Sequence, residues 1–126
     1  SPTFMLQHWV RDREGFKLSL SQAIKRQCAD TAKVYGLDDR GVLAPGYLAD
    51  INIIELSDKI GMSKPWVAND LPAGGKRLLQ SSTGYRATFK SGVQTFENGS
   101  YLGETPGILI RGPQSSPATD SLKAAS

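Results

Sequence analysis

The spacing of hydrophobic and polar residues changes about a third of the way along the chain. In the first third, hydrophobic residues recur at intervals of three and four, which is typical of amphipathic helices. From Gly41 onward they tend to alternate with polar residues, which is typical of half-buried strands. The pattern therefore predicts an α+β fold, with short N-terminal helices followed by an antiparallel β meander.

The first predicted helix begins at Thr3, whose hydroxyl suits a helix N-cap. Gly15 is expected to end this helix. Three large hydrophobic residues then fall near one another on one side of it: Phe4, Trp9 and Val10.

Two more helices are expected before the pattern changes. Ser19 and Gln22 have the spacing of a capping box, in which each side chain binds the other residue's backbone N–H group. Asp30 is placed to cap one further turn at 31–35, which Gly36 would stop. These helices are too short to form a hydrophobic core alone.

The expected strands are short and separated by specific turns. Pro45 and Gly46 suit the two central positions of a type II turn, because proline presets φ and glycine accepts a positive φ. Asn98 and Gly99 favour a type I′ hairpin turn, and 90–93 is expected to be a second tight connection. The predicted strands are 42–43, 49–55, 77–80, 85–90, 93–96, a short piece around Tyr101, and 108–110.

Composition limits the class of protein. The 126 residues suit one domain, and a mean hydropathy of −0.31 argues against a membrane-spanning chain. Fifteen basic and twelve acidic residues give a net charge of +3, and the basic residues form isolated pairs rather than the stripe typical of nucleic-acid binding. With one cysteine and no readable signal peptide, a reducing cytoplasm is the expected compartment.

Candidate catalytic and metal-binding residues are few. A catalytic zinc site needs about three protein ligands, and the chain has a single histidine and a single cysteine. His8 and Asp12 are four residues apart and form at best a two-ligand fragment. Packing, or a hydrogen bond to the backbone, is the favoured role of His8, which lies next to Trp9. Cys28 is expected to be a buried, inert thiol.

The remaining candidates also favour structural roles. Asp50 enters a strand just after a turn, where its carboxylate is placed to accept backbone N–H bonds. The glycines at 74–75 lack the spacing of a phosphate-binding loop, and the glycosylation-like sequence at 98–100 is explained by its turn. No residue is therefore assigned a catalytic, cofactor-binding or metal-binding role.

Five segments carry a resemblance to a known family. Residues 40–51, RGVLAPGYLADI, resemble the segment by which metal-dependent amidohydrolases leave the last barrel helix and enter their small β domain. The other four segments resemble the N-acyl-D-amino-acid deacylase (D-aminoacylase) branch of that superfamily: LQHWVRDR at 6–13, DLPAGGKRL at 70–78, GYRAT at 84–88 and PGILIRG at 106–112.

This resemblance implies that the chain is the C-terminal part of a larger hydrolase. Residues 1–38 would be the last helices of a TIM-like barrel, 39–113 part of a β-sandwich, and 114–126 a disordered tail. The parent would hold zinc on residues preceding this chain and hydrolyse N-acyl-D-amino acids. This chain alone would then bind no zinc and be inactive, and its partner would be the remainder of the barrel.

An alternative of a different class is an autonomous β-rich binding or oligomerisation module without catalysis. Exposed strand edges would let such a module form homo-oligomers. Neither nucleic acid nor membrane is an expected partner.

Overall fold

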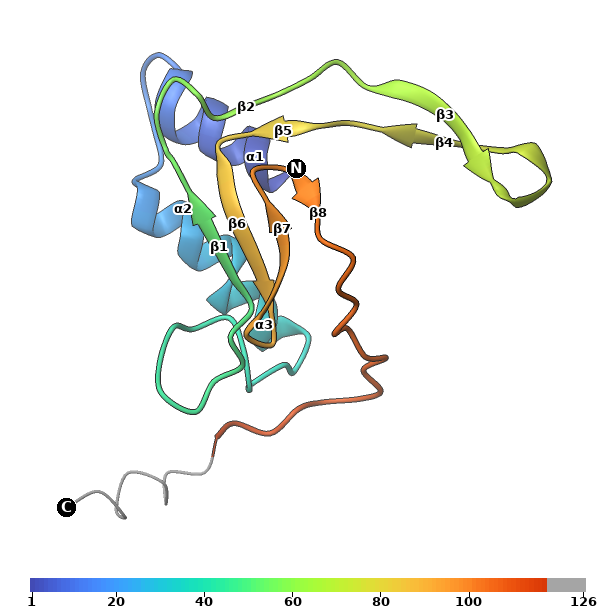
Figure 1. Ribbon diagram of the computed structural model, residues 1–126. Coiled ribbons are helices and arrows are strands. Elements are labelled where there is room, and N and C mark those ends of the chain that lie inside the picture. The colour runs from blue at the N-terminus through green and yellow to red at the C-terminus, as the bar shows by residue number, and fades with distance from the viewer. Residues whose placement is uncertain (118–126) are drawn as a thin grey trace.

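The chain forms short helices beside antiparallel β-structure, as the α+β prediction states. The structure is a computed structural model and describes residues 1–117. The helices lie along one side of a four-stranded sheet, and a two-stranded arm extends away from both (Figure 1). Among the described residues, none of the helices has the length and hydrophobicity needed to cross a membrane.

The first helix begins earlier than predicted. Ser1 occupies the N-cap position of α1 (Pro2–Phe4), and the chain continues directly into the π-helix η1 (Met5–Asp12). The prediction that Thr3 is the cap is wrong. Thr3 lies inside α1, and its hydroxyl oxygen is 2.8 Å from the hydroxyl oxygen of Tyr85, which ties this helix to the sheet.

The next two helices follow closely. The capping box of Ser19 and Gln22 is confirmed at the start of α2 (Leu20–Gln27). Helix α3 (Ala29–Val34) begins at Cys28, so the prediction of an Asp30 cap is wrong; Asp30 lies in the first turn, and Lys25 donates a hydrogen bond to its carboxylate. The chain leaves α3 through Gly36 at φ 66°, as expected.

The four-stranded sheet has the order β1-β6-β7-β8, with every neighbouring pair antiparallel. Its strands are β1 (Ile51–Ile54), β6 (Tyr85–Lys90), β7 (Val93–Glu97) and β8 (Ser100–Tyr101). The last three form the predicted meander. Both predicted tight turns are confirmed, since Ser91 and Asn98 have φ values of 52° and 46° and each is followed by a glycine at positive φ.

The chain between β1 and β6 makes one long excursion. It runs out through β2 (Gly61–Met62) and β3 (Trp66–Leu71), turns in η2 (Pro72–Gly74), and returns through β4 (Gly75–Leu79) and β5 (Ser82–Thr83). Strand β2 pairs with β5, and β3 pairs with β4. We call residues 66–79 the arm. Figure 1 shows the arm pointing away from the sheet and the helices. Strand β3 was not predicted.

Two predicted strands are absent from the described chain. Residues 42–43 lie in an irregular loop between α3 and β1, and 108–110 lie in an extended segment without strand pairing. The type II turn inside that loop is confirmed: the Tyr47 N–H group donates to the Ala44 carbonyl oxygen at 3.2 Å, and Gly46 has φ 87°. Only its assumed flanking strand at 42–43 was wrong.

The predicted tail begins in an ordered segment. Gln114 pairs with Leu37, donates its backbone N–H group to the Gly36 carbonyl oxygen at 2.7 Å, and accepts one from Asp38 at 3.1 Å. Residues 118–126 of that predicted tail lie outside the described residues.

The hydrophobic core is small and lies between the helices and the end of β1. Leu6, Ala23 and Ile60 form a buried cluster, against which three partly buried residues pack: Met5, Val10 and Ile54. Arg11 fixes the loop that carries Ile60, because its guanidinium donates to the carbonyl oxygens of Ser57 and, at 3.0 Å, Ile60. The helices and the sheet therefore share one small core.

Replacing the central residue of this core should destabilise the whole chain. The Ile60 side chain is 1% exposed, so Ile60→Ala would leave a cavity and should lower the free energy of unfolding by about 3 kcal/mol. Val34→Ala is the control, because Val34 is 83% exposed and should change stability by less than about 0.5 kcal/mol. Urea denaturation followed by circular dichroism measures both. Equal effects of the two substitutions would contradict the assigned core.

Candidate functional site

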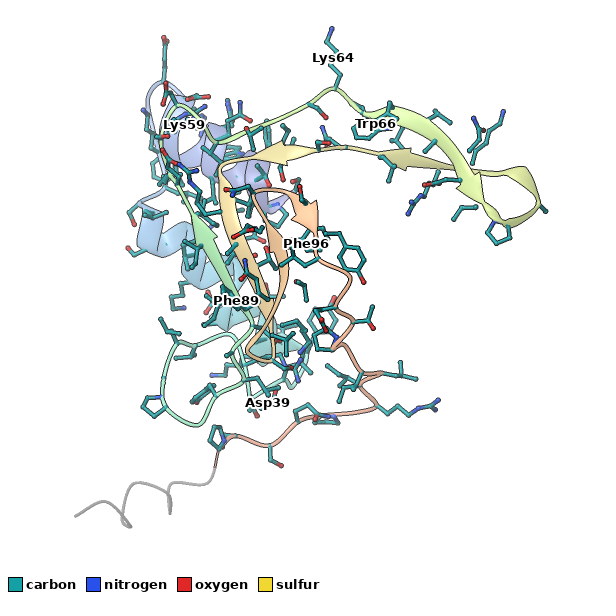
Figure 2. The ribbon with its side chains drawn as sticks, in the orientation of Figure 1. Asp39, Lys59, Lys64, Trp66, Phe89 and Phe96 are labelled. Atoms are coloured by element: carbon teal, nitrogen blue, oxygen red, sulfur yellow. The ribbon has the colours of Figure 1, made fainter. Side chains whose placement is uncertain are left out.

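A network of charged side chains joins the loop after α3 to the β6–β7 turn. Lys90 donates to both carboxylate oxygens of Asp50, at 2.9 and 3.1 Å, and the backbone N–H group of Ser91 donates to Oδ1 of Asp50 at 2.8 Å. Arg40 donates to Asp50 at 3.5 Å and to both carboxylate oxygens of Asp39 at 2.8 and 3.0 Å. We call these five residues the junction network. Asp39 marks its position in Figure 2, at the end of the sheet opposite the arm.

The junction network forms because β1 and β6 align in one register. Ile51 pairs with Phe89, which brings the preceding Asp50 beside Lys90. The backbone repeats this contact, since the Gly92 N–H group donates to the Ala49 carbonyl oxygen at 2.9 Å. The backbone pairing of β1 with β6 thus places the charges of Asp50 and Lys90 side by side, whether or not their side chains interact.

The surroundings of the two carboxylates favour their ionised forms. For Asp50, burial is the largest single influence and opposes ionisation. The hydrogen bonds from Lys90 and the Ser91 backbone, together with the positive charges of Lys90 and Arg40, outweigh it and hold the pKa of Asp50 below its usual value. The hydrogen bond from Arg40 likewise lowers the pKa of Asp39. Arg40 itself is well covered, with a side chain only 13% exposed.

The junction network is suited to holding structure rather than to catalysis. A general acid or base needs a pKa near the working pH, whereas Asp50 is displaced toward full ionisation. The prediction that Asp50 accepts a backbone N–H bond is confirmed, with the donor coming from the β6–β7 turn. The part played by Lys90 was missed. Aligning the predicted strand at 49–55 with 85–90 as an antiparallel pair would have revealed it.

The loop after Arg40 approaches helix α3 so closely that it requires glycine. A Cβ atom on Gly41 would lie 2.7 Å from the Cβ atom of Ala32 and 2.9 Å from the carbonyl oxygen of Cys28. Gly41 also has φ 83°, which side-chain-bearing residues rarely adopt. This contact holds the junction network against the helical segment.

His8 and Asp12, the candidate two-ligand fragment, are engaged in other contacts. The His8 ring stacks on Phe4 with the ring centroids 5.1 Å apart, and it meets the edge of Trp9 at 5.6 Å. Asp12 accepts two hydrogen bonds from the guanidinium of Arg11, at 2.5 and 3.0 Å, and hydrogen bonding by Arg11 lowers the pKa of Asp12. Of the two roles favoured for His8, packing against aromatic rings is the one confirmed.

Cys28 differs from its prediction, because it is exposed rather than buried. It lies at the end of α2, where helix α3 begins immediately and the chain turns away from the core. It borders a small cavity of about 200 Å³ whose other walls are mainly hydrophobic, including Ile24, Val42 and Ile51. Besides the thiol, Asp50 is the only titratable group in the walls of this cavity. Asp50 accepts hydrogen bonds from Lys90 and has a pKa below its usual value, so it is poorly suited to accept the proton of the thiol.

A larger cavity, of about 510 Å³, lies between α1, the sheet and the residues around β5. Its walls carry hydroxyl, amide and aromatic groups, with no carboxylate, imidazole or ammonium group among them. They are Pro2, Thr3, Asn52, Gln80, Ser81, Ser82, Tyr85, Ala87, Thr88, Phe96, Asn98 and Gly99. Asn52, Thr88 and Phe96 face each other across three paired strands. The cavity could hold neutral polar groups but lacks the groups that hydrolysis of an amide requires.

The side chains present do not fit a catalytic zinc ion. Within residues 1–117, histidine, cysteine, aspartate and glutamate side chains do not gather in any group of three or more that could hold a metal. A catalytic zinc site uses three protein ligands and leaves a position open for water. No catalytic step is therefore assigned to residues of the described chain.

Acid pH should weaken the junction network. Because the folded-state pKa of Asp50 is lowered, its stabilisation is complete above the unfolded-chain pKa of about 3.9 and is lost as pH falls through the lower folded-state value. Asp50→Asn should reduce the free energy of unfolding by about 2 kcal/mol at neutral pH, and this difference from the unsubstituted chain should shrink below about pH 4. Urea denaturation across pH measures both effects.

The matched control for Asp50→Asn is Asp30→Asn. Asp30 also accepts a hydrogen bond from a lysine, Lys25, but both side chains of that pair are exposed, so its loss should change stability far less. Equal losses from the two substitutions would mean that the junction network has no special structural role.

The close approach at Gly41 gives a second prediction. Gly41→Ala adds both the positive-φ penalty and a clash with α3, and should cost about 3 kcal/mol. Gly15→Ala carries the same kind of φ penalty at 75° with nothing within 4 Å of the added Cβ atom, and should cost about 1 kcal/mol. Thermal unfolding of the two variants compares them. A Gly41→Ala variant no less stable than Gly15→Ala would show that the loop does not need this contact.

Comparison with known proteins supplies the family. Neither the curated proteins nor the solved structures include a match to this sequence. A family model described as "Amidohydrolase family" matches residues 2–96, which include the helices, the junction network, the arm and most of the sheet. The match covers well over half of the chain, and the chain accordingly belongs to the amidohydrolase family.

Proposed function

We propose that this chain is the C-terminal part of a zinc-dependent amidohydrolase that hydrolyses the amide bond of N-acyl-D-amino acids. Family membership over residues 2–96 is the observation that carries the proposal, because it assigns the chain to hydrolases that are generally metal-dependent. The D-aminoacylase branch and the choice of zinc rest on the resemblance of the four segments at 6–13, 70–78, 84–88 and 106–112, which occur in the family's order.

The distribution of side chains supports a scaffolding role for this part of the protein. The acidic residues of the junction network are held ionised by cations and backbone donors, and His8 packs against two aromatic rings. The metal ligands and the groups that move protons would then belong to another part of the polypeptide, to which these helices and this sheet pack. In this proposal, residues 1–38 end a TIM-like barrel and 39–113 contribute to a β-sandwich.

Exposed hydrophobic residues on the helices and their following loop support such packing. Val34 is almost fully exposed on α3, and Tyr35 and Leu43 are exposed in the adjoining loop. Soluble monomers rarely leave large hydrophobic side chains of neighbouring segments uncovered together. The remainder of the barrel is the partner that would cover them.

Activity should depend on sequence upstream of this chain. The product of a longer reading frame ending in these residues should release free amino acid from N-acetyl-D-amino acids and not from the L-enantiomers, as measured by amine release. Removing metal with a chelator should abolish this activity, and added zinc should restore it. The 126-residue chain alone, with zinc, should show no turnover.

Two results would contradict the proposal. Turnover by the 126-residue chain alone would place the catalytic groups within it. A longer product that is folded and loaded with zinc, yet inactive on every N-acyl-D-amino acid tried, would remove the assigned substrate class.

A further inference from the structure

The arm lies within the residues assigned above to a β-sandwich, yet it extends away from the four-stranded sheet (Figure 1). Strand β3 has six residues, so the arm reaches roughly 20 Å beyond the β2–β5 pair. An isolated two-stranded ribbon is at best marginally stable in water and normally packs against another element. Figure 1 shows no other part of the described chain beside the arm.

Both broad faces of the arm carry exposed hydrophobic side chains. Val67 and Leu78 are directly paired across the two strands and therefore share one face, where they are 60% and 69% exposed. Trp66 pairs with Leu79, so it lies on the opposite face, and it is also exposed. Figure 2 shows Trp66 on the arm, well away from Phe89 and Phe96 of the sheet. A single globular neighbour would cover only one of these faces.

Two of the three charged residues of the arm form an ion pair. The Arg77 guanidinium donates to both carboxylate oxygens of Asp70, at 2.8 and 2.5 Å, so these two charges neutralise each other, whereas Lys76 is exposed next to the turn. Burying a bidentate ion pair of this kind in an interface costs less desolvation free energy than burying an isolated charge. The ion pair also holds β3 and β4 together next to the turn at Pro72–Gly74.

The excess exposed surface of the chain as a whole is larger than the area that one stable interface buries. The chain exposes 9296 Å², whereas a compact protein of 13.6 kDa exposes roughly 6,600 Å². Even if residues 118–126 were credited with roughly 1,400 Å², the value for nine fully exposed residues, more than about 1,000 Å² of excess remains. A stable interface buries about 800 Å² on each partner.

We infer that the arm is a dimerisation element that exchanges with the arm of a second copy of this chain. In a two-fold pair, the Val67–Leu78 face of each arm packs on the same face of the other arm. The Trp66 face then packs on the body of the other copy. One symmetric contact thus covers both faces of both arms, as an isologous interface does. The inference does not depend on the proposed deacylase activity.

Sedimentation velocity on the full 126-residue chain tests this inference. The unsubstituted chain should sediment as a dimer, at twice 13.6 kDa. A Val67→Lys, Leu78→Lys double variant places two charges at the centre of the proposed contact and should raise the dimer dissociation constant at least about 100-fold. Val34→Lys is the matched control: it adds a lysine at an exposed hydrophobic position on the body and should leave the dimer intact.

A spectroscopic measurement locates the contact on the arm. In a Trp9→Phe background Trp66 is the only tryptophan, and its emission should shift to shorter wavelength as the chain dimerises. Circular dichroism should show the double variant to be folded, because neither substituted residue belongs to the buried cluster.

Three outcomes would overturn the inference: a folded monomer at every concentration, a double variant that associates as the unsubstituted chain does, or a dimer that Val34→Lys disrupts equally. These measurements are made without zinc or substrate. They can therefore fail while the deacylase assay on the longer product succeeds, and the reverse also holds.

Discussion

The antiparallel pairing of β1 with β6 is the interaction on which the other parts of this structure depend. It joins residues more than thirty positions apart, with Ile51 opposite Phe89. At one end, this register places Asp50 beside Lys90 and the β6–β7 turn, so the helical segment is linked to the sheet. At the other end it brings the two strands of the excursion together, which lets β2 and β5 pair and the arm form. Closing such a long loop costs entropy, and the buried cluster around Ile60 and the junction network together offset that cost.

Local signals in the sequence predicted the elements whose geometry is decided locally. The capping box at Ser19, the turn at Pro45–Gly46 and the hairpin at Asn98–Gly99 all formed as expected, because backbone conformation at those positions is set by the residues themselves. Strand β6 was predicted over its full length for a similar reason, since it has a clear alternation and a tight turn after it.

The errors arose where a distant partner decides the outcome. The hydroxyl of Thr3 could have capped a helix, but it forms a hydrogen bond with the hydroxyl of Tyr85 on strand β6 instead. Strand β3 was missed because Asn69 and Asp70 interrupt its hydrophobic pattern, and its pairing with β4 compensates for this. Cys28 was expected to be buried at the end of an amphipathic helix, yet the immediate start of α3 leaves it exposed. Of the candidate site, sequence analysis identified Asp50 but not its cationic partners, because these depend on strand register.

Because β2 and β5 pair at the base of the arm, the length of the arm can change without changing the fold of the helices and the sheet. The β2–β5 pair closes the excursion before the arm begins, so the ends of β1 and β6 stay together whatever lies beyond Gly61 and Thr83. Because side chains alternate with a period of two along a strand, adding or deleting paired residues in steps of two would preserve the orientation of every other side chain in the ribbon. The arm is thus a place where evolution can lengthen or shorten the chain, and so vary the contacts between molecules, while the shared core is left unchanged.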